Sequence, residues 1–431
     1  MSERFHFKDY SLAGEIEVPG DKSISHRALM LASLAQGESV INRFLLSEDC
    51  NRTIEAFKAL GVQIETHGDQ VLVKSEGASA FKEPSSPLEM GNSGTTIRLL
   101  AGLLAAFSFQ VTLTGDESLS KRPMERVITP LTKMGAHFQS ITGDNKLPIK
   151  INGGKLMPIT YHLPVDSAQV KSAIILAGLL TEGQTTVVEN NPTRDHTEKM
   201  LPAFGGSIKV EEQTVTIKGK QSLKPTNLTV PGDQSSAAFW VAAALITPDS
   251  HIKVKEVGVN ETRLGFVNVL RRMGANIKVK VDRYIGDEPI GTIEVSYSTL
   301  HPTTIKPNEV PAMIDEVPLL ALVATQTYGD MTIEHIEELR YKETDRISAT
   351  VALLKNLGAN IKASNDQIEV YGRTLLKGGQ VKTNGDHRMA MMAVIASIIS
   401  EKPVTIDDVE CIQVSYPNFL DDLRGLLKEF V

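Results

Sequence analysis

The sequence predicts an α/β protein in which one supersecondary unit occurs six times, grouped as two domains of three units. A short extended segment, a polar turn and an apolar run of small residues recur together, starting near residues 15, 88, 163, 228, 308 and 381. A second, amphipathic helix follows each apolar run, and five of these helices end in a glycine turn that leads to a strand. At about 150 residues per domain, six similar units in 431 residues favour two domains.

The first unit shows the pattern most clearly. Residues 15–19 are extended, and a polar turn leads into a helix whose run from Ala28 to Ala35 is apolar on almost every side. A helix of this kind is buried. Its first turn carries hydroxyl groups and the cations Lys22 and Arg27 at the positive end of the helix dipole, so the helix start is a candidate anion site.

The two ends of the chain belong together in this scheme. Residues 5–18 alternate loosely and predict one or two strands, whereas the sixth unit should end in a helix over 416–430 with no strand after it. The N-terminal strands would therefore complete the last domain. We expect an N-terminal domain over 20–230 and a C-terminal domain over 231–431 plus 1–19.

Composition restricts the classes of partner. The net charge of −7 argues against a general nucleic-acid or membrane surface, and no apolar run is long enough to span a bilayer. The first ten residues do not form a signal peptide, and neither Cys50 nor Cys411 has a metal-ligand or redox spacing. We expect a cytoplasmic monomer that binds no metal.

Cations gather at the predicted helix starts in both halves of the chain: Lys22, Arg27, Arg122, Lys171, Lys342, Arg346 and Arg388. Arginine and lysine in this number suit substrates with several negative charges. Titratable groups among them, namely Asp315, Glu343 and His387, are typical of proton transfer. The plainer interpretation is that these are solvated helix ends and, for Asp315, a helix cap. The sequence contains no Walker loop and no dinucleotide-binding fingerprint.

Five motifs in one order resemble those of the 5-enolpyruvylshikimate-3-phosphate synthase family, and the resemblance runs the whole length of the chain. They are Gly20-Asp-Lys-Ser-Ile-Ser-His-Arg27, Gly91-Asn-Ser-Gly-Thr-Thr96, Lys121-Arg-Pro-Met124, Arg340-Tyr-Lys-Glu-Thr-Asp-Arg346 and Gly385-Asp-His-Arg388. The resemblance implies the two-domain enolpyruvyl transferase fold, an inside-out α/β prism in which each domain has three βαβαββ repeats with buried parallel helices. It also implies transfer of the enolpyruvyl group of phosphoenolpyruvate to the 5-hydroxyl of shikimate 3-phosphate, with release of phosphate.

The resemblance further implies a role for each matching residue. Asp315, Glu343 and Lys22 would be catalytic, with Glu343 exchanging a proton with the methylene carbon. The residues implied to bind shikimate 3-phosphate are Lys22, Ser23, Arg27, Ser167, Gln169, Asp315 and Lys342. Those implied to bind phosphoenolpyruvate are Lys22, Gly94, Arg122, Gln169, Arg346 and Arg388, with Asn92, Thr95 and His387 in support. Both substrates are small molecules, and no cofactor is implied.

Two positions depart from the family pattern. Val414 stands where many members have a lysine that contacts phosphoenolpyruvate, and Ala168 replaces a second serine. Segments 122–126, 167–171 and 191–194 resemble the glyphosate-tolerant class II members. Two alternatives stay open: the sister transferase that acts on UDP-N-acetylglucosamine, which uses a loop cysteine as general acid, and a non-catalytic anion-binding repeat protein.

Overall fold

The computed structural model describes residues 2–429, which divide into two compact units. The N-terminal unit comprises Gly20–Pro231 and the short segment Tyr284–Glu288. The C-terminal unit comprises the chain up to Pro19, then Gly232–Arg283 and everything from Pro289 onward. Each unit has its own hydrophobic core, so each is described separately.

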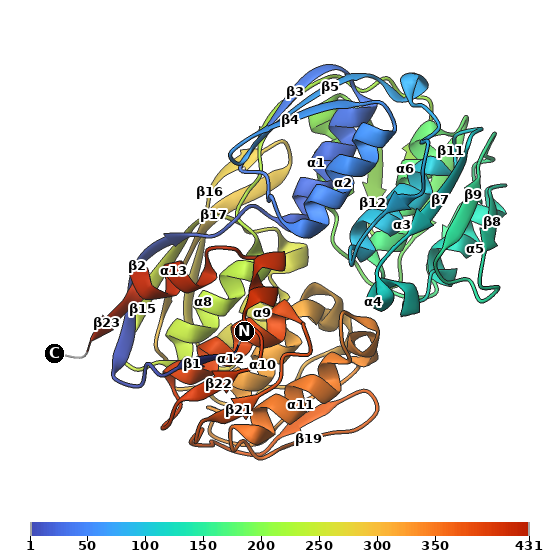
Figure 1. Ribbon diagram of the computed structural model, residues 1–431. Helices are drawn as coiled ribbons and strands as arrows, with labels where there is room; N and C mark the ends of the chain where they lie inside the picture. Colours follow the sequence, from blue (N-terminus) through green and yellow to red (C-terminus); the bar gives the residue numbers. More distant parts are fainter. Residues whose placement is uncertain (1, 430–431) are drawn as a thin grey trace. The chain divides into compact units, whose positions relative to one another are not determined.

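Three buried helices form the centre of the N-terminal unit: α1 (Lys22–Leu34), α3 (Gly94–Leu104) and α6 (Ala168–Leu180). The closest pair is α3 and α6, because Gly102 faces the backbone of Ala173 with no room for a side chain between them. Small residues thus allow the helices to approach, as expected for a chain with few aromatic residues. The outer helices are α2 (Glu48–Ala59), α4 (Glu117–Lys121), α5 (Glu125–Lys133) and α7 (His196–Met200). Figure 1 shows α1 and α2 lying side by side.

Three four-stranded sheets surround these helices, one for each unit of the repeat. The first sheet contains β14 (Asn227–Thr229), β3 (Gln36–Asn42), β5 (Gln70–Glu76) and β4 (Gln63–His67) in that order. The second contains β6 (Leu88–Glu89), β7 (Gln110–Thr114), β9 (Ile149–Asn152) and β8 (His137–Ser140). The third contains β10 (Thr160–His162), β11 (Gln184–Val188), β13 (Thr214–Lys218) and β12 (Ile208–Glu211). In each sheet the first strand is parallel to its neighbour and the other pairings are antiparallel.

The C-terminal unit repeats this plan. Its buried helices are α8 (Gln234–Ile246), α10 (Val317–Ala324) and α12 (His387–Ile398), and they contact one another. All 13 residues of α8 are buried, because the helix is apolar on every side. The outer helices are α9 (Gly265–Arg272), α11 (Arg346–Asn356) and α13 (Phe419–Leu426).

The sheets of the C-terminal unit take up both ends of the chain. One contains β16 (Asn276–Ile285), β17 (Glu288–Ser296), β15 (His251–Gly258), β2 (Tyr10–Glu17) and β23 (Leu427–Glu429). Another contains β18 (Met331–Ile333), β20 (Ile368–Val370) and β19 (Ile361–Ala363), and the last contains β1 (Glu3–Phe5), β22 (Val404–Ile406) and β21 (Gly379–Val381). The predicted N-terminal strands therefore exist as β1 and β2.

Two local predictions were wrong. We expected a helix to the end of the chain, but α13 ends at Leu426 and the next three residues form β23, which pairs with the exposed edge of β2. The expected strand near residue 308 is a 3₁₀ helix, η4 (Pro307–Ala312). Pro307 and Pro311 lack the N–H groups that a sheet ladder needs, which explains the difference.

Residues 284–288 differ from the expected boundary. They form the tip of the β16–β17 hairpin, yet they cluster with the N-terminal unit. Within that unit Ile285 packs against the core, and His196 Nδ1 lies 3.2 Å from a carboxylate oxygen of Glu288. This association was not predicted, because residues 284–288 resemble an ordinary polar hairpin turn in sequence.

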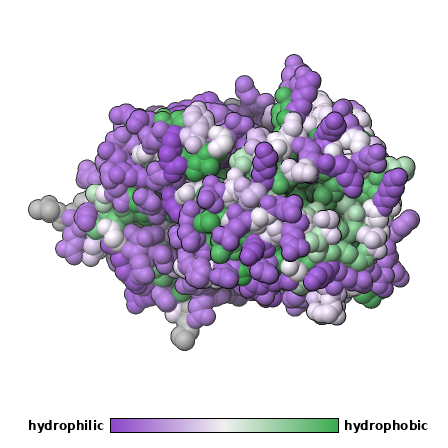
Figure 2. All heavy atoms as spheres, turned by 90° about the horizontal axis from the view of Figure 1, so that it is seen from above, coloured by the Kyte–Doolittle hydropathy of each residue, from purple (hydrophilic) through white to green (hydrophobic). Residues whose placement is uncertain are grey.

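The face in Figure 2 is covered mainly by hydrophilic side chains, with smaller and separate apolar areas. In the part of the chain that the structure describes, no helix combines the length and apolar character needed to cross a membrane.

Candidate active site

The first turn of α1 is built around Asp21 and Lys22. Asp21 caps the helix, since its side chain accepts a hydrogen bond from the backbone N–H of Ile24. Lys22 follows directly, and its Nζ lies 3.0 Å from Oδ2 of Asp49. Ser47, not Asp49, caps α2, so the carboxylate of Asp49 can pair with Lys22. The predicted ligand Lys22 is thus a half-buried cation with a fixed partner.

Arg27 connects three elements of the N-terminal unit. Its guanidinium donates to Thr197 Oγ1 at 2.8 Å, to Ser172 Oγ at 2.7 Å and to the carbonyl oxygen of Ser23 at 3.0 Å. The side chain is buried, so these contacts with α6 and α7 fix its position before any ligand arrives. Ser23 lies in the same turn, and its carbonyl group is committed to Arg27.

Two guanidinium groups converge on the start of α3. Gly94 is its first residue, and a Cβ atom added there would lie 3.1 Å from Nη1 of Arg98 and 3.3 Å from Nη1 of Arg122. Arg122 donates to Asn92 Oδ1 at 2.5 Å, and Asn92 donates onward to Asp116 at 2.8 Å. A helix N-terminus beside two guanidinium groups is a candidate anion site.

Gln169 joins this group from the first turn of α6. Its Oε1 accepts from Arg98 Nη1 at 2.5 Å, and its Nε2 donates to Thr95 Oγ1 at 3.1 Å. Ser167 caps α6 by accepting from the N–H of Val170. The structure therefore brings together the starts of α1, α3 and α6, which carry the site residues predicted for this half of the chain except Arg122, and Arg122 reaches the start of α3 from the end of α4.

Lys171 does not belong to this group of available cations, contrary to our prediction. It is almost completely buried, with Nζ 2.7 Å from Glu198 and 3.0 Å from Glu189. Burial alone would lower the pKa of Lys171, but the attraction of the two carboxylates raises it, so the lysine stays charged and paired. Sequence spacing could not reveal Glu189 and Glu198, which lie in other elements.

The basic motif over residues 121–124 lies at the junction of two helices. Arg122 is the C-cap of α4, and Pro123 lies between α4 and α5. The cation still reaches the start of α3 because α4 is short and its end faces Asn92.

A buried hydroxyl chain stabilises these helix starts. His26 Nδ1 lies 2.7 Å from Thr53 Oγ1, which contacts Thr96 Oγ1 at 2.8 Å, and Thr96 contacts Ser93 Oγ at 2.6 Å. The chain links α1, α2 and α3. Burial lowers the pKa of His26 to about 3, partly opposed by Asp49 and assisted by Lys22 and Arg27, so the imidazole is neutral.

In the C-terminal unit one buried guanidinium contacts three carboxylates. Arg346, the first residue of α11, places Nε 2.8 Å from Asp386, Nη2 2.6 Å from Glu343 and Nη1 3.4 Å from Asp315. Burial alone would lower the pKa of Arg346, but the attraction of Asp386 and then Glu343 outweighs it and the pKa is raised. The carboxylates of Asp315 and Glu343 remain partly exposed.

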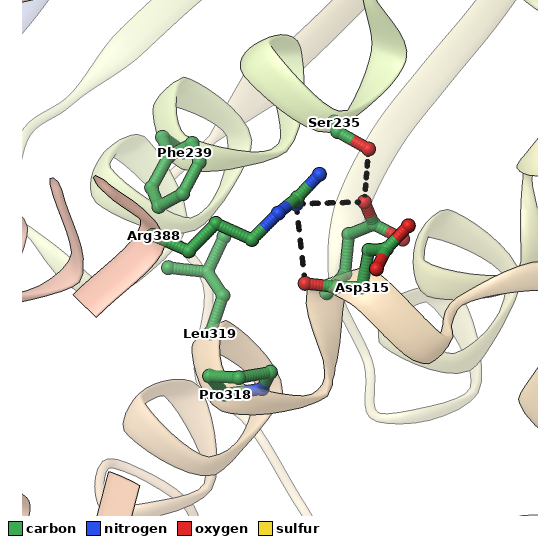
Figure 3. Close-up of a pocket in the computed structure, with 7 residues that line it drawn as sticks. Ser235, Phe239, Asp315, Pro318, Leu319 and Arg388 are labelled. Carbon is green, nitrogen blue, oxygen red and sulfur yellow. Dashed lines mark hydrogen bonds and ion pairs between the residues drawn. The ribbon is translucent and has the colours of Figure 1, made fainter. Parts of the chain in front are cut away.

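The other predicted residues of this half border the same cluster. Lys342 Nζ lies 3.6 Å from Asp315, and Arg388 donates to the carbonyl oxygen of Asp315 at 3.2 Å. His387 is buried at the start of α12. Figure 3 shows Arg388 reaching across the pocket toward Asp315 and Ser235. The pocket is lined by Ser235, Phe239, Asp315, Glu316, Pro318, Leu319 and Arg388.

The cysteines are poor candidates for a general acid. Cys50 is buried in α2, where burial raises the pKa of its thiol. Burial and Asp408 raise the pKa of Cys411 to about 12. Val414 ends the 3₁₀ helix η7 (Glu410–Val414), so that turn offers no cation at this position.

Sequence reasoning missed three residues that touch the predicted ones: Arg98, Asp49 and Glu316. Arg98 gave a signal, because a charged residue inside an otherwise apolar helix needs a partner. Asp49 and Glu316 resembled ordinary acids in a first helical turn, and nothing local distinguishes a cap from a partner of a distant cation.

The chain matches one family of known proteins over nearly its whole length. The family model described as EPSP synthase (3-phosphoshikimate 1-carboxyvinyltransferase) matches residues 8–423. The chain is 48% identical over 418 residues to the 3-phosphoshikimate 1-carboxyvinyltransferase of Oceanobacillus iheyensis, covering 97% of each chain. It is 46% identical to that of Bacillus subtilis, covering 98% of this chain and 99% of the relative.

Solved structures give the same result. The EPSP synthase of Acinetobacter baumannii superposes with a TM-score of 0.88 at 39% identity, with 99% of each chain covered. The enolpyruvyl transferase NikO of Streptomyces tendae has a TM-score of 0.79 at 18% identity, covers 99% of this chain and 98% of its own, and shows a shared fold alone. The predicted fold class is confirmed.

The fold and the two clusters of cations and carboxylates define an enolpyruvyl transferase. Within that class, the chain belongs to the EPSP synthase family, the 3-phosphoshikimate 1-carboxyvinyltransferases. The sister transferase and a non-catalytic repeat protein are not favoured.

The buried histidine generates a prediction about acid stability. The pKa of His26 is about 3 in the folded state and near 6.5 when unfolded, so only the unfolded chain takes up this proton as the pH falls between these values. The free energy of unfolding should therefore fall by up to about 1.4 kcal/mol per pH unit from this group. Urea unfolding between pH 7 and pH 4.5 should show a shallower pH dependence for His26→Gln. The exposed His137→Gln is the control, and equal slopes for His26→Gln and the native chain would contradict the account.

Proposed function

We propose that this chain transfers the enolpyruvyl group of phosphoenolpyruvate to the 5-hydroxyl of shikimate 3-phosphate, and that the clusters of both units serve this one reaction. The observation that carries the proposal is the Arg346 cluster, in which two partly exposed carboxylates lie beside Lys342 and Arg388. Both substrates are anions, and the mechanism needs a carboxyl group as proton donor and acceptor.

The N-terminal unit offers groups for both anions. Lys22, Ser23 and Arg27 at the start of α1, with Ser167 and Gln169 at the start of α6, are proposed to bind shikimate 3-phosphate. Gly94 and Arg122 are proposed to bind phosphoenolpyruvate, with Lys22 and Gln169 shared between the substrates and Asn92 and Thr95 as their immediate support. The open backbone N–H groups of three helix starts support this assignment.

The C-terminal unit is proposed to supply the chemistry. In the addition step, a proton passes from the carboxyl group of Glu343 to the methylene carbon while the 5-hydroxyl oxygen bonds to the adjacent carbon and gives its proton to Asp315. In the elimination step, the carbon–oxygen bond to phosphate breaks, the leaving phosphate takes the proton held by Asp315, and Glu343 takes a proton back from the methyl group, so both carboxyl groups return to their starting states. Arg346 and Arg388 are proposed to bind phosphoenolpyruvate, and Asp315 and Lys342 to bind shikimate 3-phosphate. The cations Lys342, Arg346 and Arg388 would also stabilise the negative charge of the intermediate. His387 is buried beside this cluster and would support Arg388.

We further propose that the enzyme acts as a cytoplasmic monomer on these small-molecule substrates. The net charge of −7, which argues against a general membrane or nucleic-acid surface, supports this part of the proposal.

The role of Glu343 is tested by Glu343→Gln. The amide keeps the size of the side chain but cannot exchange a proton with carbon, so turnover should fall by about 100-fold or more while ligand binding changes little. Initial rates of phosphate release and calorimetric titration with each substrate measure the two effects. Glu337→Gln, in the exposed turn of η6 (Glu337–Tyr341), is the matched control. If Glu343→Gln turned over at nearly the rate of the native enzyme, the proposed role of Glu343 in proton transfer would be wrong.

Glyphosate, which competes with phosphoenolpyruvate in this family, tests the geometry around Gly94. Glyphosate is longer than phosphoenolpyruvate, and Gly94 lies against Arg98 and Arg122 with little space to spare. We predict a glyphosate inhibition constant well above the KM for phosphoenolpyruvate, measured at several phosphoenolpyruvate concentrations. Gly94→Ala should raise that KM, because the added methyl group presses on both guanidinium groups. Inhibition as tight as substrate binding would refute the assignment to the tolerant class but not the reaction.

A further inference from the structure

The turn and first helical residues at the start of α8, residues 231–236, contain no lysine or arginine, unlike the corresponding segment at the start of α1. In the structure the missing cation comes from Arg263, in the 3₁₀ helix η3 (Glu261–Arg263). Arg263 contacts Ser235 in the first turn of α8, and Ser235 contacts Glu316, which precedes α10. The turn is therefore connected to the predicted active-site residues through side chains.

We propose that Glu316 is a positioning residue that fixes the guanidinium of Arg388, and that Ser235 and Arg263 in turn fix Glu316. The inference rests on the proposed role of Arg388 in binding phosphoenolpyruvate. It assigns three residues of the C-terminal unit to the recognition of one substrate, although none of the three has to touch that substrate.

The contacts form a continuous chain. Arg263 Nη2 donates to Ser235 Oγ at 2.8 Å, and Ser235 Oγ donates to Glu316 Oε1 at 2.5 Å. The same carboxylate oxygen lies 3.5 Å from Nη1 of Arg388. Figure 3 shows the part of this arrangement from Ser235, at the start of α8, to Arg388, which extends toward it. Oε1 of Glu316 thus accepts hydrogen bonds from both the Ser235 hydroxyl and the Arg388 guanidinium.

The donor and acceptor in each of these hydrogen bonds follow from the chemistry of the side chains. A guanidinium has only donors, so the oxygen of Ser235 must accept from Arg263. The single hydroxyl proton of Ser235 is then left for Glu316, which must accept it. Glu316 consequently presents a carboxylate oxygen to Arg388, and its side chain cannot turn away without leaving the Ser235 proton unpaired.

Burial makes these contacts strong. The side chains of Arg263 and Glu316 are 3% and 5% exposed, and that of Arg388 is 13% exposed. Asp233, 3.6 Å from Arg263, balances the charge at the buried end. The low dielectric constant of the protein interior strengthens each electrostatic interaction and raises the free energy needed to break it.

The orientation of Arg388 follows from this anchoring. Its Nη1 is held by Glu316 and by the carbonyl oxygen of Asp315. Its Nε and Nη2 make no hydrogen bond to any residue that the structure describes, so they are available to an anion. Loss of Glu316 would let the guanidinium rotate, and a displacement of about 1 Å can cost on the order of 100-fold in rate.

The test compares the KM values of the two substrates in Glu316→Gln, Ser235→Ala and the double variant. Glu316→Gln should raise the KM for phosphoenolpyruvate by about tenfold or more and leave that for shikimate 3-phosphate within about twofold. Ser235→Ala should act in the same direction, and the double variant should be little worse than Glu316→Gln, because the residues act as one chain. Glu288→Gln, an equally buried carboxylate of the N-terminal unit, controls for a purely structural effect.

Arg388→Lys separates the inference from the function on which it rests. If Arg388→Lys raises the phosphoenolpyruvate KM while Glu316→Gln and Ser235→Ala do not, the positioning role is overturned and the role of Arg388 stands. If Arg388→Lys changes neither KM, the assignment of Arg388 fails and the inference fails with it. Ser235→Ala leaves every charge in place, so it carries the test even where Glu316→Gln lowers the yield of folded protein.

Discussion

The buried guanidinium of Arg346 is the constraint on which the C-terminal cluster depends. Removing an ion from water costs several kcal/mol even after relaxation, so this side chain can be buried only with carboxylates around it. Asp386, Glu343 and Asp315 supply them from three separate segments. The requirement brings the starts of α11 and α12 and the turn before α10 together, and it leaves two of the three carboxylates partly exposed for chemistry.

The candidate site of the N-terminal unit is not built around one arginine shared by several carboxylates. It is made from helix starts, whose N–H groups remain available after capping by Asp21, Ser93 and Ser167. Hydroxyl groups, the Gln169 amide and buried arginines hold these starts in position. The positive potential of this site therefore comes from the N–H groups of helix starts as well as from charged side chains. This is consistent with an acidic protein that binds anionic substrates.

Much of the fold could be predicted because each repeat has the same local sequence pattern: an extended segment, a polar turn and an apolar helix. The helix α8 is apolar on every side, and a polar turn before it predicts where it begins. The site residues were predicted because whole motifs resembled a family, and the structure brings them into two clusters. Lys171 was misjudged because its carboxylate partners are distant in sequence. The strand β23 was missed because strand pairing depends on an edge that the local sequence does not show.

We propose that turnover requires the contacts of the Arg346 guanidinium with Asp315, Glu343 and Asp386. The most direct test is kcat/KM for phosphoenolpyruvate in Arg346→Lys, with circular dichroism to verify folding. Lysine keeps the charge but replaces a planar group that has five donors with a single ammonium. The account predicts a folded protein with kcat/KM lower by about 100-fold or more, because Asp315 and Glu343 lose their common partner. A folded variant with kcat/KM within about threefold of the native value would contradict it, since positioning by these contacts would then contribute almost nothing.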